Sequence, residues 1–355
     1  MKHKNTSKKN TRKILNPFEF IKNESDTKIY KYEYTTEHAI TEEKNNLEKI
    51  NEHKLTNSIV WLNIDGSDKN IIKKIATIYN IHDLLIEDIL SHGQRPKYDE
   101  VNEVIFTLLY MLYYNDDTKE IEIEQISIVL TKSTILTFQE NADKDVFKNI
   151  STLLKNKAGK IRNRNADYLF YALLDTIVNS YYQVIEKLGI EIENLETTII
   201  ENPRQDAFKR INQLRKELIL LKRNTVPVRD LIASIMRMEN ELLEERTKKY
   251  LKDVYDQIMQ ANELAENYRE FTMSLQDLYL NTVNLKMNEI MKTLAILTAV
   301  MAPATVIGGI FGMNFEKMPI IHNNLGFLIT VGLMILIPIF MLWWFFYRGW
   351  FKKEY

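Results

Sequence analysis

Oxygen-bearing side chains are the groups in this 355-residue sequence that could bind or move ions. The chain has no cysteine, which excludes disulfides, thiolate metal ligands and a cysteine nucleophile. Its six histidines show no spacing typical of a metal site. Carboxylates, amides and hydroxyls remain, and these suit hard cations. Any metal chemistry is therefore expected to use oxygen ligands.

One face of a long predicted helix carries such groups in a regular pattern. Residues 228–302 contain neither proline nor glycine, so we expect a continuous helix over about 246–311, roughly 100 Å long. Alternating steps of three and four select a face that is polar in its first part, at Gln260, Glu263, Asn267, Glu270, Ser274, Asp277, Asn281, Asn284 and Asn288. The same face continues with mostly small or hydroxyl residues, at Met291, Ala295, Thr298, Ala302, Thr305, Gly309 and Gly312.

Two ordinary interpretations compete with a functional one for this face. The polar part could be a solvated helix surface, and the small residues could serve tight helix packing. Because the polar residues and the small residues lie on one face in a single helical register, the pattern instead favours a continuous water-filled path along the helix. Since two membrane spans cannot enclose a channel, such a path implies a homo-oligomer with the first span inside and the second facing lipid.

The membrane interpretation rests on two uncharged segments near the C-terminus, 293–315 and 325–347. Twenty-three helical residues span about 35 Å, and the hydrocarbon core is about 30 Å thick. A buried hairpin in a soluble protein is the alternative. The net charge of −1 and the mean hydropathy of −0.28 are averages over these spans and a charged body.

Positive charges flank both spans on the same side, which predicts that both chain ends are cytoplasmic. They are Lys286, Lys292, Arg348, Lys352 and Lys353. Aromatic residues expected at the inner interface are Trp343, Trp344, Tyr347 and Trp350.

The rest of the chain divides into segments of different character. We expect a basic, disordered tail at 1–24, a cytoplasmic α/β domain at 25–160 and a helical hairpin at 161–245. The stalk helix and first span follow at 246–312, with the span at about 293–312, then an external loop at 313–324, the second span at 325–347 and a basic tail at 348–355. Predicted strands are 29–34, 59–64, 104–114, 121–130 and 134–138. Predicted helices are 68–79, 83–90, 146–157, 166–200 and 205–223.

The end of the first span carries Gly312-Met313-Asn314, and this tripeptide between two C-terminal spans resembles the CorA-type magnesium transporter family. The likeness extends to the segments 92–97, 166–169 and 288–292 and covers nearly the whole chain after about residue 25. It implies an α+β membrane protein that forms a funnel-shaped homopentamer in the cell membrane, with divalent cations passing inward.

The resemblance also implies roles for individual residues. The outer ion-binding ring would be formed by Gly312, Met313 and Asn314, with Glu316 in the external loop. Pore-lining positions would be Asp277, Asn284, Asn288, Met291, Leu294, Thr298, Ala302, Thr305 and Gly309. Regulatory Mg2+ between subunits would be held by Glu87, Asp88, Asp175 and Asp253, although acidic residues such as these are more often simply solvated.

Other functions remain to be weighed. Enzyme signatures such as His-Glu-x-x-His and phosphate-binding glycine loops are absent from the sequence, so no enzyme is expected. A membrane-anchored coiled coil would need an apolar heptad seam along 246–288, whereas the selected face is polar. Within transport, Mg2+ is the expected ion and regulator, and Co2+, Ni2+ or Zn2+ are the alternatives. No nucleic-acid partner is expected from the balanced charge.

Overall fold

A computed structural model of the chain describes residues 27–44, 47, 50–66, 68–101, 103–141, 146–313 and 325–351. The predicted basic tail at 1–24, Asn314 and Glu316 lie outside the described residues, as does most of the predicted loop at 313–324. The chain forms two compact units: Met1–Thr197 with Phe208–Leu275, and Thr198–Ala207 with Gln276–Tyr355.

The first unit contains a seven-stranded sheet in the order β2-β1-β3-β7-β6-β5-β4. Its strands are β1 Lys28–Tyr34, β2 Ala39–Glu43, β3 Ile59–Asp65, β4 Lys97–Val101, β5 Val104–Asn115, β6 Glu120–Leu130 and β7 Thr134–Gln139. The five predicted strands are confirmed, while β2 and β4 were missed. Both missed strands are short edge strands with few fully buried residues, so the hydrophobic alternation that reveals a strand is weak in them.

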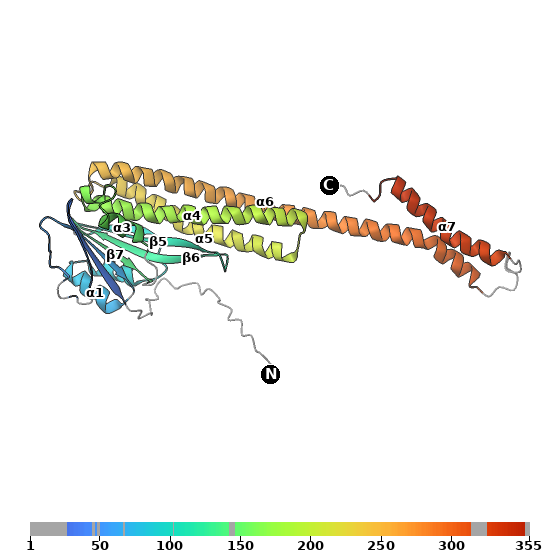
Figure 1. Cartoon of the computed structure of the whole chain (residues 1–355), viewed down its shortest axis with the longest axis horizontal. Helices are drawn as coiled ribbons and strands as arrows, with labels where there is room; N and C mark the ends of the chain where they lie inside the picture. The colour runs from blue at the N-terminus through green and yellow to red at the C-terminus, as the bar shows by residue number, and fades with distance from the viewer. Residues whose placement is uncertain are drawn as a thin grey trace, which may run out of the picture. The chain divides into compact units, whose positions relative to one another are not determined.

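Parallel pairing of β3 with β7 joins two antiparallel parts of the sheet. Helix α1, Lys69–Ile78, begins at Asp68, whose carboxylate accepts the backbone N–H groups of Asn70 and Ile71. Helix α2, Asp83–Leu90, follows closely. Figure 1 shows α1 on one side of the sheet and α4 on the other, so both faces of the sheet are covered.

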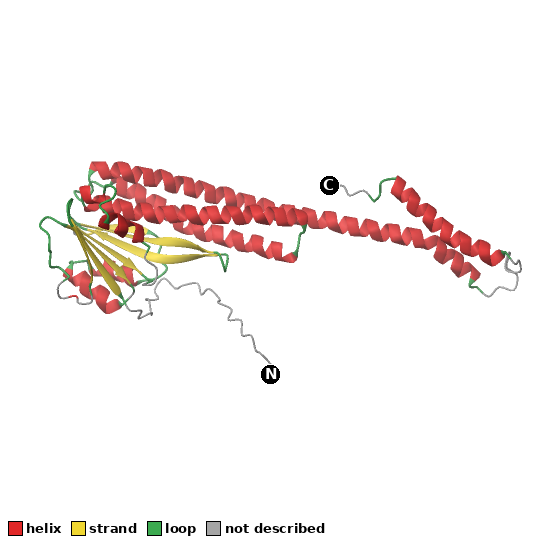
Figure 2. Cartoon of the chain, in the orientation of Figure 1, coloured by secondary structure: helices red, strands yellow, loops and turns green. Residues whose placement is uncertain are grey.

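Helices make up nearly all of the described chain after the sheet, as Figure 2 shows. They are α3 Lys148–Lys155, the short 3-10 turn Ile161–Asn163, α4 Ala166–Glu201, α5 Gln205–Arg237, α6 Glu245–Phe311 and α7 Gly326–Tyr347. The 67-residue α6 matches the continuous helix predicted from the run without proline or glycine.

The predicted end of a helix at residue 223 is wrong, because α5 continues through Pro227 to Arg237. Proline removes one helical N–H, a loss that often ends a helix. Here the helix is buried on both sides of the proline: Thr225, Val228 and Ile232 are all 0% exposed. Burial of these residues outweighs the missing hydrogen bond.

An apolar seam does run along the first part of α6, contrary to the expectation from its polar face. The buried residues that share heptad-like spacing are Leu251, Val254, Ile258, Ala261 and Ala265. Cross-helix hydrogen bonds flank the seam, with Thr225 Oγ1 donating to Asn262 Oδ1 at 2.7 Å and Tyr182 donating to the Gln257 carbonyl at 2.7 Å. The seam faces α4 and α5 of the same chain and lies on a different side of the helix from the polar face.

The second unit contains the end of α6 and α7. Both α6 and α7 are long and apolar enough to cross a membrane. They pack together through Ile296 and Val300 on α6 and Phe345 on α7, which are 5–7% exposed. Pro303 and Pro338 lie inside these helices, as membrane helices tolerate.

Candidate functional site

The predicted pore-lining residues lie on the surface of α6. Asp277, Asn284, Asn288, Met291, Leu294, Thr298, Ala302, Thr305 and Gly309 are all exposed in the single chain. Exposure alone does not select them, since neighbours such as Leu297 and Val306 are exposed too. Their position relative to α7 is more informative.

The face of α6 that contacts α7 is opposite the predicted pore face. Ile296 and Val300 are 6% and 5% exposed against α7. Thr298 and Ala302 each follow one of these residues by two positions, which turns a side chain by about 200° around the helix axis. The small and hydroxyl residues therefore point away from the second span.

Hydroxyl groups on this face retain the ability to accept hydrogen bonds. Thr298 Oγ1 donates to the Leu294 carbonyl at 2.9 Å, and Thr305 Oγ1 donates to the Met301 carbonyl at 3.0 Å. Each donor is thus used within the helix, and the lone pairs of the hydroxyl oxygen remain for water. Such oxygens can bind the outer waters of a hydrated cation.

Helix α6 ends in a tight turn at the predicted outer site. The Gly312 N–H donates to the Gly308 carbonyl at 2.9 Å, and the Met313 N–H donates to the Ile310 carbonyl at 3.3 Å. Both residues are exposed. Asn314, the third member of the tripeptide, lies outside the described residues, so its placement stays a prediction.

Asp88, one of the four predicted regulatory carboxylates, already has partners within the chain. Lys97 Nζ lies 2.6 Å from Asp88 Oδ2, and the Gln94 amide donates to Asp88 Oδ1 at 2.9 Å. Glu87, its neighbour on α2, is exposed. Gln94 and Lys97 belong to the segment 92–97, and their pairing with Asp88 was not predictable from the sequence because a turn separates them from α2.

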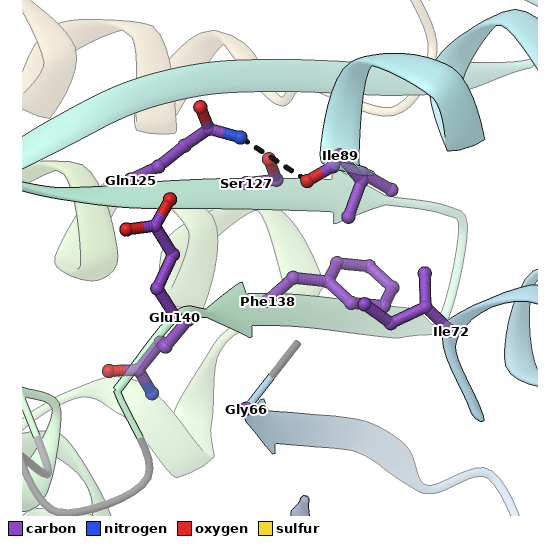
Figure 3. Close-up of a pocket in the computed structure, with 8 residues that line it drawn as sticks. Gly66, Ile72, Ile89, Gln125, Ser127, Phe138 and Glu140 are labelled. Atoms are coloured by element: carbon purple, nitrogen blue, oxygen red, sulfur yellow. Dashed lines mark hydrogen bonds between the residues drawn. The ribbon is translucent and has the colours of Figure 1, made fainter. Parts of the chain in front are cut away.

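A buried polar network holds the end of α2 in place. The Gln125 amide on β6 donates to the Ile89 carbonyl at 3.3 Å, as Figure 3 shows. It lies beside a small pocket that Ser127, Phe138 and Glu140 also line. Near this pocket, His92 Nδ1 lies 2.7 Å from Glu140, and that contact raises the pKa of His92 above its ordinary value. The network thereby fixes the backbone that carries Glu87 and Asp88.

Asp175 on α4 and Asp253 on α6 are the other two predicted regulatory carboxylates. Burial raises the pKa of Asp175 above its ordinary value and the charge of Asp253 adds to this, while a hydrogen bond from Asn179 opposes it. Asp253 is exposed. Two carboxylates that repel each other in this way would gain from a bound cation.

The four predicted regulatory carboxylates do not come together at one site within a single chain. Over the described ranges, no three histidine or acidic side chains come together in a way that could hold a metal ion. A divalent ion at any of these carboxylates would need further ligands from water or from another copy.

Comparison with known proteins agrees with the two spans, the long helix and the α/β unit. The family model described as CorA-like Mg2+ transporter protein matches residues 56–353. The chain belongs to the CorA-like Mg2+ transporter family. Members of this family are transporters, which confirms the expectation that the protein is not an enzyme.

Individual relatives in this family span most of the chain. The Cobalt/magnesium transport protein CorA of Thermotoga maritima is 36% identical over 291 residues, which are 82% of this chain and 83% of that protein. The zinc transport protein ZntB of Yersinia enterocolitica is 19% identical and covers 82% of this chain and 87% of its own. The complete structure of the CorA magnesium transporter from Methanocaldococcus jannaschii has a TM-score of 0.72, with 22% identity, over 91% of this chain and 98% of that one. This last likeness shows a shared fold.

Proposed function

We propose that the protein is a channel that carries Mg2+ into the cell through a homopentameric pore lined by α6. The main observation behind this proposal is that α6 has two opposite faces of different character. One face of α6 packs against α7, and the face half a turn away carries Thr298, Ala302 and Thr305, exposed in the single chain. A central bundle of α6 helices surrounded by α7 helices would turn the second face to a shared axis.

The proposed pore suits an ion that keeps its waters. Mg2+ dehydrates reluctantly, so amide and hydroxyl oxygens that bind its hydration shell are better pore ligands than a carboxylate ring. In this proposal, Asn284 and Asn288 line the inner part and Asn314 forms an outer ring. A divalent ion gains about 4.6 kcal/mol per 100 mV of membrane potential, which drives its entry.

Leu294 would form an apolar constriction in this pore. Its side chain is 61% exposed in the single chain. Leu294 lies two residues before Ile296, which packs on α7, so it points away from the second span. A ring of leucines excludes water when narrow, so it can close the path without any charged group. Ala302, which is small, would leave the pore wider about two turns further along.

Regulation in this proposal comes from Mg2+ at the carboxylates Glu87, Asp88, Asp175 and Asp253. The raised pKa of Asp175 indicates an unfavourable charge that a cation would relieve. Mg2+ bound between neighbouring subunits would hold the pentamer closed, and its loss would release the subunits. In this proposal both chain ends lie on the cytoplasmic side of the cell membrane, the side that the flanking positive charges favour.

Ion flux into liposomes tests the conduction proposal. Purified full-length protein should admit Mg2+ when an inside-negative potential is applied, and Asn314→Ala should reduce that flux strongly. Asn70→Ala removes an exposed amide of the same kind from α1, in the other compact unit, and serves as the matched control. Failure of the protein to admit any divalent ion would contradict the proposal.

Transport of Co2+, Ni2+ or Zn2+ is the second candidate function. The Thermotoga maritima relative is described as a cobalt/magnesium transport protein and the Yersinia relative as a zinc transport protein. The lack of cysteine and the oxygen-rich pore face favour the harder Mg2+. Faster flux of Zn2+ than of Mg2+ in the same liposomes would favour the alternative.

A further inference from the structure

The chain turns sharply where α7 ends, in a way that fixes an aromatic side chain. Gly349 has φ of +77°, in the left-handed region that favours glycine. The Trp350 N–H donates to the Phe345 carbonyl at 3.1 Å, and the Gly349 N–H donates to the Phe346 carbonyl at 3.1 Å. These two bonds define a Schellman motif, which folds the chain back over the last turn of the helix.

This turn brings Trp350 against both spans. Its ring centroid lies 5.1 Å from that of Phe345, which is 7% exposed and packs on α6. The Lys292 Nζ of α6 lies over the Trp350 ring, 6.0 Å from its centroid. On α7, the Arg348 guanidinium lies 5.2 Å from the centroid of the Trp344 ring. Two cations are therefore held against aromatic rings at one end of the hairpin.

Both cations lack an anionic partner within the chain as described. Neither Lys292 nor Arg348 makes an ion pair with any described residue, and Glu289, one turn before Lys292, makes none either. Lys286, about two turns earlier on α6, instead donates to the neutral side-chain oxygen of Asn202 at 3.2 Å. The charges of Lys292 and Arg348 therefore remain available to an anion at this end of the hairpin.

Position along the sequence puts these cations at a membrane boundary. Lys292 is the last charged residue before the uncharged segment of α6, and Arg348 is the first after that of α7. Tryptophan and basic residues concentrate at the depth of lipid headgroups. Basic pockets between spans at this depth are suited to anionic headgroups.

We propose that Lys292, Arg348 and Trp350 form a binding site for the phosphate headgroup of an anionic phospholipid. The ammonium and guanidinium groups bind the phosphate, and the exposed aromatic edges of Trp344 and Trp350 contact the glycerol and upper acyl chain. Gly349 is a positioning residue, because its left-handed conformation holds Trp350 over Lys292. The site requires the α6–α7 hairpin to lie in a membrane, but it does not depend on ion conduction.

Quenching of tryptophan fluorescence by brominated lipids tests the site in the full-length protein. Reconstituted protein is compared in vesicles with brominated phosphatidylglycerol and with brominated phosphatidylcholine. We expect preferential quenching by phosphatidylglycerol. Lys292→Gln and Arg348→Gln should each lower that preference about fivefold, and Gly349→Ala should lower it while leaving both charges in place. Equal quenching by the two lipids in the unmodified protein would overturn the proposal.

Two controls separate the site from general surface charge. Lys286→Gln removes one positive charge from the same helix and should change the preference less than twofold. A loss as large as that of Lys292→Gln would show that bulk charge attracts the lipid, and the proposal would fail. Inorganic phosphate, compared with chloride at equal ionic strength, should not restore fluorescence. Displacement of the lipid by phosphate would assign the site to a soluble anion and contradict a lipid site.

Discussion

The two parts of α6 satisfy their apolar surface in different ways. Between Glu245 and Leu275, the helix buries residues such as Leu251 and Ile258 completely against its own chain. From Gln276 to Phe311, only Ile296 and Val300 are buried, while Leu294 and Leu297 are about three-fifths exposed. One helix thus belongs first to a self-contained fold and then to a segment whose surface needs lipid or further copies of the chain. Substitutions in the first part should affect folding, and those in the second should affect transport.

A matched pair of leucine substitutions should give the largest contrast in stability. Leu251→Ala removes a 0% exposed side chain and should lower the free energy of unfolding by about 2–5 kcal/mol, because it leaves a cavity. Leu297→Ala truncates a 59% exposed side chain and should cost far less. Chemical unfolding of the full-length protein in detergent, followed by circular dichroism, measures both. Equal losses would remove the distinction between the two parts of α6.

Gly189 on α4 packs closely against α6, so we expect its substitution to lower the free energy of unfolding by a smaller amount. A Cβ atom there would lie 2.8 Å from the Tyr268 Cζ atom, closer than packed atoms approach. Gly189→Ala should therefore cost about 1–3 kcal/mol through overpacking. The double variant with Tyr268→Phe, which removes the crowding hydroxyl, should recover part of the loss in the same unfolding experiment. No recovery would mean that the helices move apart instead.

Substitution of Glu33, on β1 of the sheet, should lower the stability by a still smaller amount, and this effect should depend on pH. Burial raises the pKa of its carboxyl, but this is outweighed by the backbone N–H groups of Leu55 and Lys54, the Ser58 hydroxyl and Lys31, so the pKa is lower than its ordinary value of 4.5. The stabilisation is therefore present above about pH 4.5 and is lost as the pH falls through the folded pKa.

Glu33→Gln keeps one acceptor oxygen and removes the charge, so it should cost about 1 kcal/mol at pH 7 and less at pH 3. Unfolding curves at the two pH values check this, and Mg2+ flux per folded protein should stay unchanged. A cost that is the same at both pH values would show that the charge of Glu33 contributes nothing.

The sequence predicted the elements whose signal is local. Runs of β-branched and aromatic residues marked five strands, and the absence of proline and glycine marked α6 as one helix. It failed where tertiary packing overrides local signals: α5 passes Pro227 because its next turns are buried, and the seam at Leu251 and Ile258 depends on which face meets α4 and α5.

For the candidate sites, the sequence predicted which residue types share one face of a helix, but not which other parts of the chain that face contacts. Spacing alone placed Thr298 and Ala302 on the same side of α6, but only the packing of Ile296 and Val300 on α7 relates that side to the second span. The pairing of Asp88 with Lys97 depends on the turn after α2. The proximity of Asp175 and Asp253 depends on the packing of α4 and α6, which local sequence does not encode.

The natural chain contains no cysteine, so single cysteines can be introduced without background labelling. Their accessibility tests most directly whether this face of α6 lines a water-filled path. Single variants Thr298→Cys and Ala302→Cys are compared with Ile296→Cys and Val300→Cys on the α7 side, in liposomes that admit Mg2+. A charged, water-soluble thiol reagent reacts with thiolate, which forms in water and not in an apolar contact. We predict that it labels residues 298 and 302 and blocks their Mg2+ flux, while residues 296 and 300 stay unlabelled. Labelling at 296 and 300 with protection at 298 and 302 would contradict a pore on this face.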